Sequence, residues 1–132
     1  MLVADRRGAT PLPPVSVPAL IDSGSWKSMF PLGVARALGI GEHELVEDLD
    51  GAMGVGSLFR IWNTTVPIRA EIGLTRRDGR LRRWGPRFAL SPVFIEHDAF
   101  LLGRADFFRL FTITFEATAH GRVFHLDMES NG

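Results

Sequence analysis

Turn-forming residues recur at short intervals along most of this chain. Fourteen of the 132 residues are glycine and eight are proline, and both residue types interrupt regular secondary structure. Between them lie stretches of strand length, for example at residues 122–128, and residues 88–95 are a further strand candidate that Pro92 interrupts. Many short strands separated by turns are typical of a barrel or a sandwich. The sequence therefore predicts an all-β fold with one or two short helices.

The N-terminal part of the chain is predicted to be extended. Residues 8–18 include four prolines, which forbid a helix and disfavour a central strand. An edge strand fits only at Val15 and Val17. We therefore divide the chain into an extended, Pro-rich N-terminal segment over residues 1–14 and one domain over residues 15–132.

Local signals place several elements inside this domain. A short helix is predicted after Pro31, because proline suits the first helical position and Gly39 suits the position after the end. Residues 41–50 carry five acidic side chains and are predicted to form a solvated loop. The Asp-Gly pair at residues 78–79 predicts a hairpin turn. A second short helix is predicted over residues 104–110.

Composition excludes several classes of function. The chain has 15 basic and 15 acidic residues and a formal net charge of zero, which argues against binding to nucleic acid or to an anionic membrane. It has no cysteine, so disulfides and thiolate metal sites are excluded. The histidines lack the spacing of metal ligands. No secretory signal and no long apolar run is found, so we expect a cytoplasmic protein without a metal site.

The residues with the clearest chemical potential begin at Asp22. This acid directly follows the apolar run at residues 19–21, where a carboxylate is costly unless the protein uses it. Ser23 supplies a hydroxyl, and Gly24 lets the backbone turn. Two such carboxylates on a twofold axis would share one proton, so that one acts as a base on water while the other polarises a peptide carbonyl. The alternative for Asp22 is a purely structural turn.

The sequence Asp-Ser-Gly-Ser at residues 22–25 resembles the Asp-Thr/Ser-Gly-Ala/Ser signature of retropepsin-like aspartic proteases. Other features resemble this family in the same order, over roughly residues 15–128. A Gly-rich stretch resembles the flap hairpin of retroviral proteases, and its residues are Met53, Gly54, Val55 and Gly56. A second apolar run resembles the hydrophobic-hydrophobic-Gly-Arg motif beneath the active site, and its residues are Leu101, Leu102, Gly103 and Arg104. Residues 105–108 are similar to the short helix that follows this motif.

The resemblance implies a closed acid-protease barrel and a homodimer that hydrolyses the peptide bonds of a peptide or protein without a cofactor. Asp22 would be the catalytic residue of each subunit. Ser23, Gly24 and Ser25 would support the active-site loop, and the flap would close over the substrate. The second motif would be structural, and the strand at residues 123–128 would supply the dimer interface.

Two departures from the family pattern leave other hypotheses open. In retroviral members, an Asp two positions after the motif glycine pairs with the arginine of the second motif. Here that position is Trp26, followed by Lys27, so no partner of Arg104 is predicted. The second hypothesis is therefore a catalytically weak or inactive module for dimerisation or peptide binding. A third is a nucleic-acid-binding hairpin, suggested by the arginines around residues 78–79, although a solvated hairpin tip explains them more simply.

Overall fold

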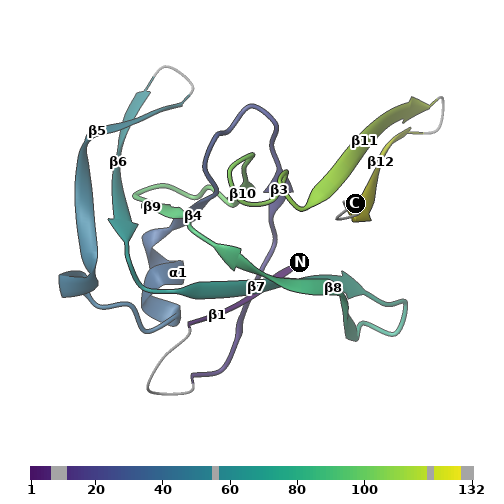
Figure 1. Ribbon diagram of the computed structural model, residues 1–132, viewed down its shortest axis with the longest axis horizontal. Coiled ribbons are helices and arrows are strands. Elements are labelled where there is room, and N and C mark those ends of the chain that lie inside the picture. Colours follow the sequence, from purple (N-terminus) through teal and green to yellow (C-terminus); the bar gives the residue numbers. More distant parts are fainter. Residues whose placement is uncertain (7–11, 55–56, 119–120, 129–132) are drawn as a thin grey trace.

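The computed structural model describes residues 1–6, 12–54, 57–118 and 121–128. Its strands form three sheets, with a single α-helix among the described residues (Figure 1). The predicted all-β class is confirmed. Each of the larger sheets has two open ends, so the described strands form no closed barrel.

The first sheet has four strands in the order β2-β1-β7-β8, and all neighbours in it are antiparallel. These strands are β1 (Leu2–Arg6), β2 (Val15–Val17), β7 (Ile68–Thr75) and β8 (Leu81–Leu90). The predicted edge strand at Val15 and Val17 is confirmed as β2. Strand β1 was not predicted, yet it lies between β2 and β7. Its residues Leu2, Val3 and Ala4 are all buried, a continuous apolar run with no alternation to signal a strand.

The second sheet has six strands in the order β3-β10-β4-β9-β6-β5. These strands are β3 (Leu20–Ile21), β10 (Leu101–Leu102), β4 (Met29–Pro31), β9 (Val93–Ile95), β6 (Ser57–Thr64) and β5 (Leu45–Gly54). Strand β3 is parallel to β10, and β4 is parallel to β9. The two short apolar runs that end at Asp22 and at Gly103 are therefore adjacent strands that point the same way.

The third sheet is the antiparallel hairpin of β11 (Phe111–Thr118) and β12 (Gly121–Met128). It extends away from the two larger sheets on one side of the molecule (Figure 1). The strand predicted at residues 123–128 is confirmed as part of β12. Ile113 and Leu126 pack against the core, which ties the base of this hairpin to the domain.

Helix α1 (Leu32–Ala37) confirms the short helix predicted after Pro31. Two other local predictions were wrong. The stretch at residues 41–50 is no loop: it holds a 3-10 turn η1 (Glu42–Glu44) and the first part of β5. Ion pairs explain how acidic residues are accommodated there, because Glu44 lies 2.7 Å from the Arg6 guanidinium and Glu47 pairs with Arg60.

The other wrong prediction is the helix at residues 104–110, which form consecutive turns instead. Their backbone hydrogen bonds run from Phe107 N to Gly103 O at 3.1 Å and from Leu110 N to Phe107 O at 3.2 Å. Seven residues barely offset the cost of helix nucleation, and phenylalanine has only moderate helix propensity. Packing of Phe107 in the core therefore decides the conformation of this segment.

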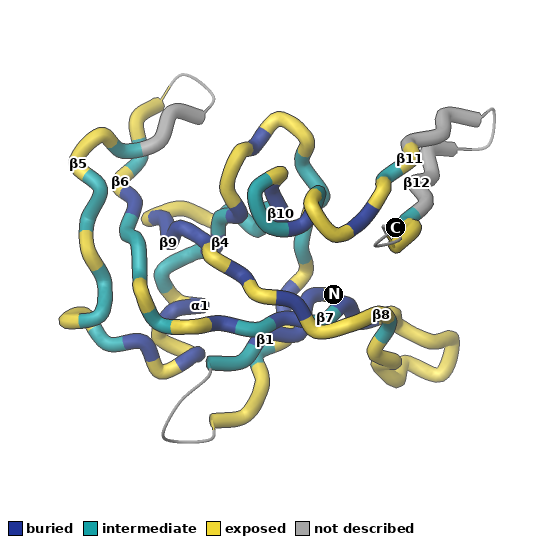
Figure 2. The backbone as a smooth tube through the Cα atoms, viewed as in Figure 1, coloured by how far each residue is buried: buried dark blue, intermediate teal, exposed yellow. Residues whose placement is uncertain are grey.

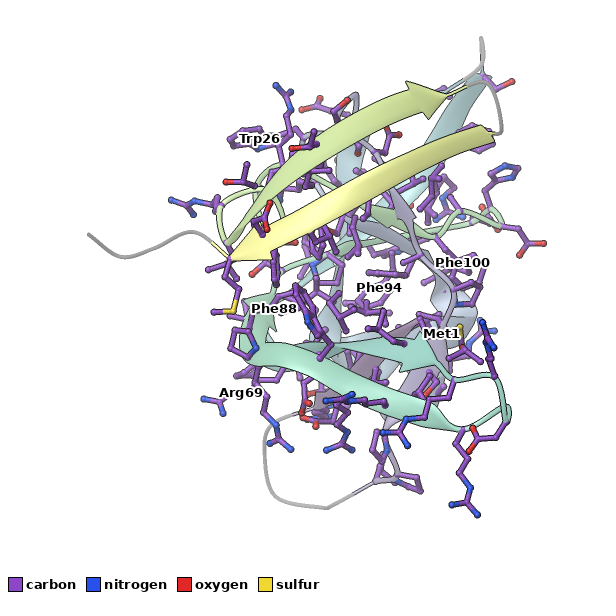
Figure 3. The ribbon with its side chains drawn as sticks, turned by 90° about the vertical axis from the view of Figure 1, so that its right-hand side faces the viewer. Met1, Trp26, Arg69, Phe88, Phe94 and Phe100 are labelled. Carbon is purple, nitrogen blue, oxygen red and sulfur yellow. The ribbon has the colours of Figure 1, made fainter. Side chains whose placement is uncertain are left out.

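The main core lies between the four-stranded sheet, α1 and the middle of the six-stranded sheet (Figure 2). Phe30, Phe94, Phe107 and Phe111 are its largest fully buried side chains. Phe88 and Phe94 point into the interior, whereas Trp26 lies at the outer surface (Figure 3). No helix in the described ranges is long and apolar enough to cross a membrane.

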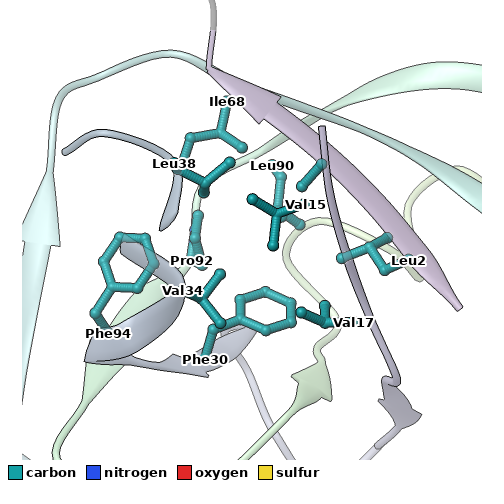
Figure 4. A pocket seen from close by; sticks show the side chains of 11 residues that line it. Leu2, Val15, Val17, Phe30, Val34, Leu38, Ile68, Leu90, Pro92 and Phe94 are labelled. Carbon is teal, nitrogen blue, oxygen red and sulfur yellow. The ribbon is translucent and has the colours of Figure 1, made fainter. Parts of the chain in front are cut away.

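The apolar pocket in Figure 4 is a packing gap in this core. Its lining side chains come from both larger sheets and from α1, and they include Leu2, Val17, Phe30 and Val34. The free volume is about 10 Å³, which is no more than a single water needs. This gap is therefore too small to hold a substrate or a cofactor.

Candidate active site

Asp22 is the first residue after β3, and it lies beside the end of β10. Leu20 N donates to Phe100 O at 2.8 Å, and Asp22 N donates to Leu102 O at 3.0 Å. The register pairs Leu20 with Leu101 and Ile21 with Leu102. The structure therefore brings together the two motifs, which are about 80 residues apart in the sequence.

The Asp22 carboxylate is held in a tight turn. Its Oδ1 accepts a hydrogen bond from Gly24 N at 2.8 Å, and Ser25 N donates to the Asp22 carbonyl at 3.2 Å. Asp22 itself is half-buried. Within the described residues, no other group donates a hydrogen bond to this carboxylate. One carboxylate oxygen thus fixes the orientation of the group, while the side chain stays accessible from solvent.

The serines on either side of Gly24 have different environments. Ser25 is buried, and its hydroxyl donates to Lys27 O at 2.6 Å. This bond closes the loop between β3 and β4 on itself. Ser23 is exposed and its hydroxyl has no hydrogen-bond partner within the described residues. The Ser25 hydroxyl therefore holds this loop together, and the Ser23 hydroxyl is available to a molecule outside this chain.

Gly103 brings the turn after β10 against the loop of Asp22. A Cβ at this position would lie 2.5 Å from both C and O of Lys27 and 2.9 Å from Ser28 N. The next two residues continue the contact, because Arg104 N donates to Ser25 O at 3.0 Å and Ala105 N donates to Trp26 O at 2.8 Å. Only glycine permits this backbone approach.

We expect Gly103→Ala to destabilise the fold by about 1–3 kcal/mol, because a methyl group pressed against backbone forces the two loops apart. Chemical denaturation of both proteins measures the difference. Gly33→Ala is a matched control, since a Cβ at Gly33 would meet nothing within 4 Å. An unchanged midpoint for Gly103→Ala would contradict the close contact.

Arg104 has a partner that the sequence did not predict. Its guanidinium lies 5.4 Å from the centroid of the Trp26 ring. Arginine stacks favourably on tryptophan, and such contacts contribute about 0.5–1 kcal/mol at exposed sites. Trp26 is 60% exposed. The residue that departs from the family pattern thus contacts the arginine with its ring instead of a carboxylate.

Two of the four residues predicted to form the flap, Met53 and Gly54, lie at the end of β5. Met53 pairs with Leu58 and Gly54 pairs with Ser57, so β5 and β6 are antiparallel neighbours up to this point. Val55 and Gly56 lie outside the described residues. The strand order places β5 and β6 at the opposite end of the six-stranded sheet from β3.

Two other features bear on the alternatives. The predicted Asp-Gly turn is confirmed between β7 and β8. The arginines around it lie on an exposed hairpin, which agrees with the simpler interpretation of a solvated hairpin tip. These arginines are Arg76, Arg77, Arg80, Arg82 and Arg83. Within the described ranges, no three acidic or histidine side chains gather closely enough to hold a metal ion.

Sequence reasoning missed one ionisable group near the site, the carboxyl of Asp106. Burial raises its pKa above the ordinary value, against hydrogen bonds from Ser28 and from the Ser91 backbone that lower it. The signal that could have found it is an acid set directly before the apolar pair Phe107-Phe108. Comparison with known proteins adds no assignment: no protein-family model matches this chain, and no curated protein matches it.

Proposed function

We propose that this protein is an aspartic endopeptidase of the retropepsin-like type, active as a homodimer with one Asp22 from each subunit. The observation that carries the proposal is the position of Asp22. It is a half-buried carboxylate at the end of a short strand, oriented by Gly24 and joined by backbone hydrogen bonds to the Leu-Leu-Gly-Arg motif. A structural turn alone would not need that second motif beside it.

In the proposed reaction, two Asp22 carboxyl groups on the twofold axis share one proton, because like charges at contact distance cannot both ionise easily. The ionised carboxylate removes a proton from water, whose oxygen attacks the peptide carbonyl carbon. The protonated partner donates its proton to the carbonyl oxygen. When the tetrahedral intermediate collapses, the C–N bond breaks and the leaving nitrogen takes a proton from one carboxyl group. The other carboxylate takes a proton from a hydroxyl of the intermediate, which forms the carboxylic acid product and restores the single shared proton.

A second subunit also suits the outer parts of the chain. The β11–β12 hairpin pairs with no other described strand, and a two-stranded sheet alone is only marginally stable. Strands from a partner copy would extend this sheet and bring the two Asp22 loops together. Such an enzyme loses activity on dilution, because a monomer holds half of the dyad.

The proposed substrate is an extended peptide that lies as an added strand between Asp22 and a closing β5–β6 flap. Leu20 lies two residues before Asp22 and is 64% exposed, and Trp26 is 60% exposed. Exposed apolar side chains that flank a catalytic group favour apolar side chains in the ligand. We therefore expect cleavage sites flanked by large apolar residues.

The direct test is incubation with a diverse peptide mixture from about pH 4 to pH 7, which spans carboxyl titration in such dyads. Mass spectrometry identifies the products, and the protein concentration is varied across the dimerisation range. We expect cleavage whose specific rate rises with protein concentration until the dimer is saturated. Absence of cleavage by a folded dimer would overturn the proposal.

A second candidate function is a dimerisation or peptide-binding module without catalysis. It is favoured by the Trp26–Arg104 contact and by the engagement of Asp22 Oδ1 in its own turn, since both serve the fold without any reaction. The distance between the two Asp22 carboxyl groups in the dimer distinguishes the two functions. The enzyme requires the two Asp22 carboxyl groups within hydrogen-bonding reach across the dimer, whereas the module does not.

A further inference from the structure

The Asp106 carboxyl lies next to Ser28, the last residue of the loop that carries Asp22. Its Oδ2 is buried and has no hydrogen-bond partner among the described residues. The Ser28 side chain and the Ser91 backbone hydrogen-bond to the carboxyl, which leaves them to Oδ1. A buried polar atom without a partner costs free energy and needs an explanation. No step of the proposed reaction uses this group.

Ser28 connects Asp106 to the turn after β10. The residue is fully buried, and its Oγ accepts a hydrogen bond from Gly103 N at 3.0 Å. A serine hydroxyl has one proton to donate, and here the Asp106 carboxyl receives it. The resulting chain runs from the Gly103 amide through the Ser28 hydroxyl to Asp106, and hydrogen bonds in such a chain strengthen one another.

This chain crosses between the two segments that define the candidate site. Ser28 ends the loop at residues 22–28, and Gly103 begins the turn at residues 103–106. The same two segments are joined by the bonds from Arg104 N to Ser25 O and from Ala105 N to Trp26 O. These backbone bonds lie at the surface end of the contact, and the Ser28 bond lies in its buried interior.

We propose that Asp106 is a positioning residue whose carboxyl, acting through Ser28 on the Gly103 amide, sets the spacing of the Asp22 loop from the turn after β10. Asp106 does not touch the substrate in this scheme. Its meaning for catalysis rests on the proposed function, because the spacing determines where Asp22 meets its partner. The coupling between the two segments is a property of the fold and does not depend on any reaction.

The same contact makes the stability of the protein depend on pH. Burial raises the pKa of Asp106, and the hydrogen bonds of Ser28 and Ser91 together with the charges of Lys27 and Arg109 only partly oppose it. These are the charged groups that face it, Lys27 from the Asp22 loop and Arg109 from its own segment. Since the folded protein holds this proton more tightly than the unfolded chain, stability falls as pH rises through the raised pKa.

Asp106→Asn tests this pH dependence. The amide oxygen of asparagine can still accept the hydrogen bond from Ser28, and the amide nitrogen carries hydrogens where the protonated acid has its proton. The amide does not ionise. We expect the melting temperature of Asp106→Asn, relative to wild type, to rise by about 3 °C or more between pH 4 and pH 8. The exposed Asp98→Asn is the control, and its difference from wild type should stay constant. A constant difference for Asp106→Asn would overturn the pH dependence.

Ser28→Ala, Asp106→Ala and the double variant test the relay. The readout is hydrogen exchange at the Gly103 amide, followed by NMR. We expect each single variant to exchange about 10-fold faster at this amide, and the double variant no faster than the faster single one. If the increase in exchange rate for the double variant equals the product of the two single increases, the two residues act independently and the relay is overturned. Neither experiment requires peptide hydrolysis, so an inactive wild type would overturn the proposed function and leave this inference standing.

Discussion

We expect Asp22→Asn to abolish peptide hydrolysis while the protein keeps its fold. The asparagine has nearly the same shape, and its amide oxygen can still accept the hydrogen bond that Gly24 N donates to Asp22 Oδ1 at 2.8 Å. It can neither remove a proton from water nor share a proton with its partner. Loss of acid–base catalysis lowers kcat by about 10²–10⁴-fold, and loss of the shared proton affects both roles of the dyad.

The measurement is kcat/KM on the best peptide from the mixture, at the pH of maximal wild-type activity, together with the oligomeric state of both proteins. Asp98→Asn changes an exposed aspartate outside the site and should keep wild-type activity. Activity retained by a dimeric Asp22→Asn would show that another group carries the reaction. A monomeric Asp22→Asn would instead place Asp22 in the dimer contact, as the binding-module hypothesis allows.

The positions of the strands that lie near Asp22 followed from short-range signals in the sequence. The runs that end at Asp22 and at Gly103 are each two or three apolar residues followed by a glycine-containing turn, and such a pattern marks the end of a buried strand. The pattern does not show which strands pair with each other. The parallel pairing of Leu20 with Leu101 joins residues about 80 positions apart, and only the resemblance to a family placed these runs in one site.

The contacts that were missed depend on burial, which a local pattern such as an acid before Phe107-Phe108 indicates only weakly. Asp106 sits in a polar-apolar alternation that suits a surface turn equally well, and Ser28 is an ordinary residue of a loop. Phe107 is fully buried, the Oδ2 atom of its neighbour Asp106 is buried as well, and Ser28 lies next to that carboxyl. Trp26 was similarly unassignable, because an exposed tryptophan can face solvent, a ligand or, as here, the Arg104 guanidinium.

Phe107 is the side chain on which this arrangement depends, and we expect Phe107→Ala to cost about 3–5 kcal/mol of stability. The ring is fully buried. It stacks on Phe111 with centroids 4.7 Å apart and meets Phe88 edge-on at 6.1 Å. Its removal leaves a cavity where the turn after β10, the β11–β12 hairpin and β8 converge. Natural domains of this size are stable by only about 5–15 kcal/mol, so much of that margin would be lost.

Chemical denaturation of wild type, Phe107→Ala and Phe107→Leu separates the contributions. Leucine keeps most of the apolar volume, so its cost should stay near 1–2 kcal/mol by comparison with other core exchanges, or roughly a third of the alanine effect. Phe108→Ala is the matched control, because Phe108 is only half-buried and contacts Phe107 edge-on at 6.3 Å. Equal losses at positions 107 and 108 would contradict the burial pattern. A loss confined to Phe107 would mean that the core holds Asp106, and with it the Asp22 loop, in place.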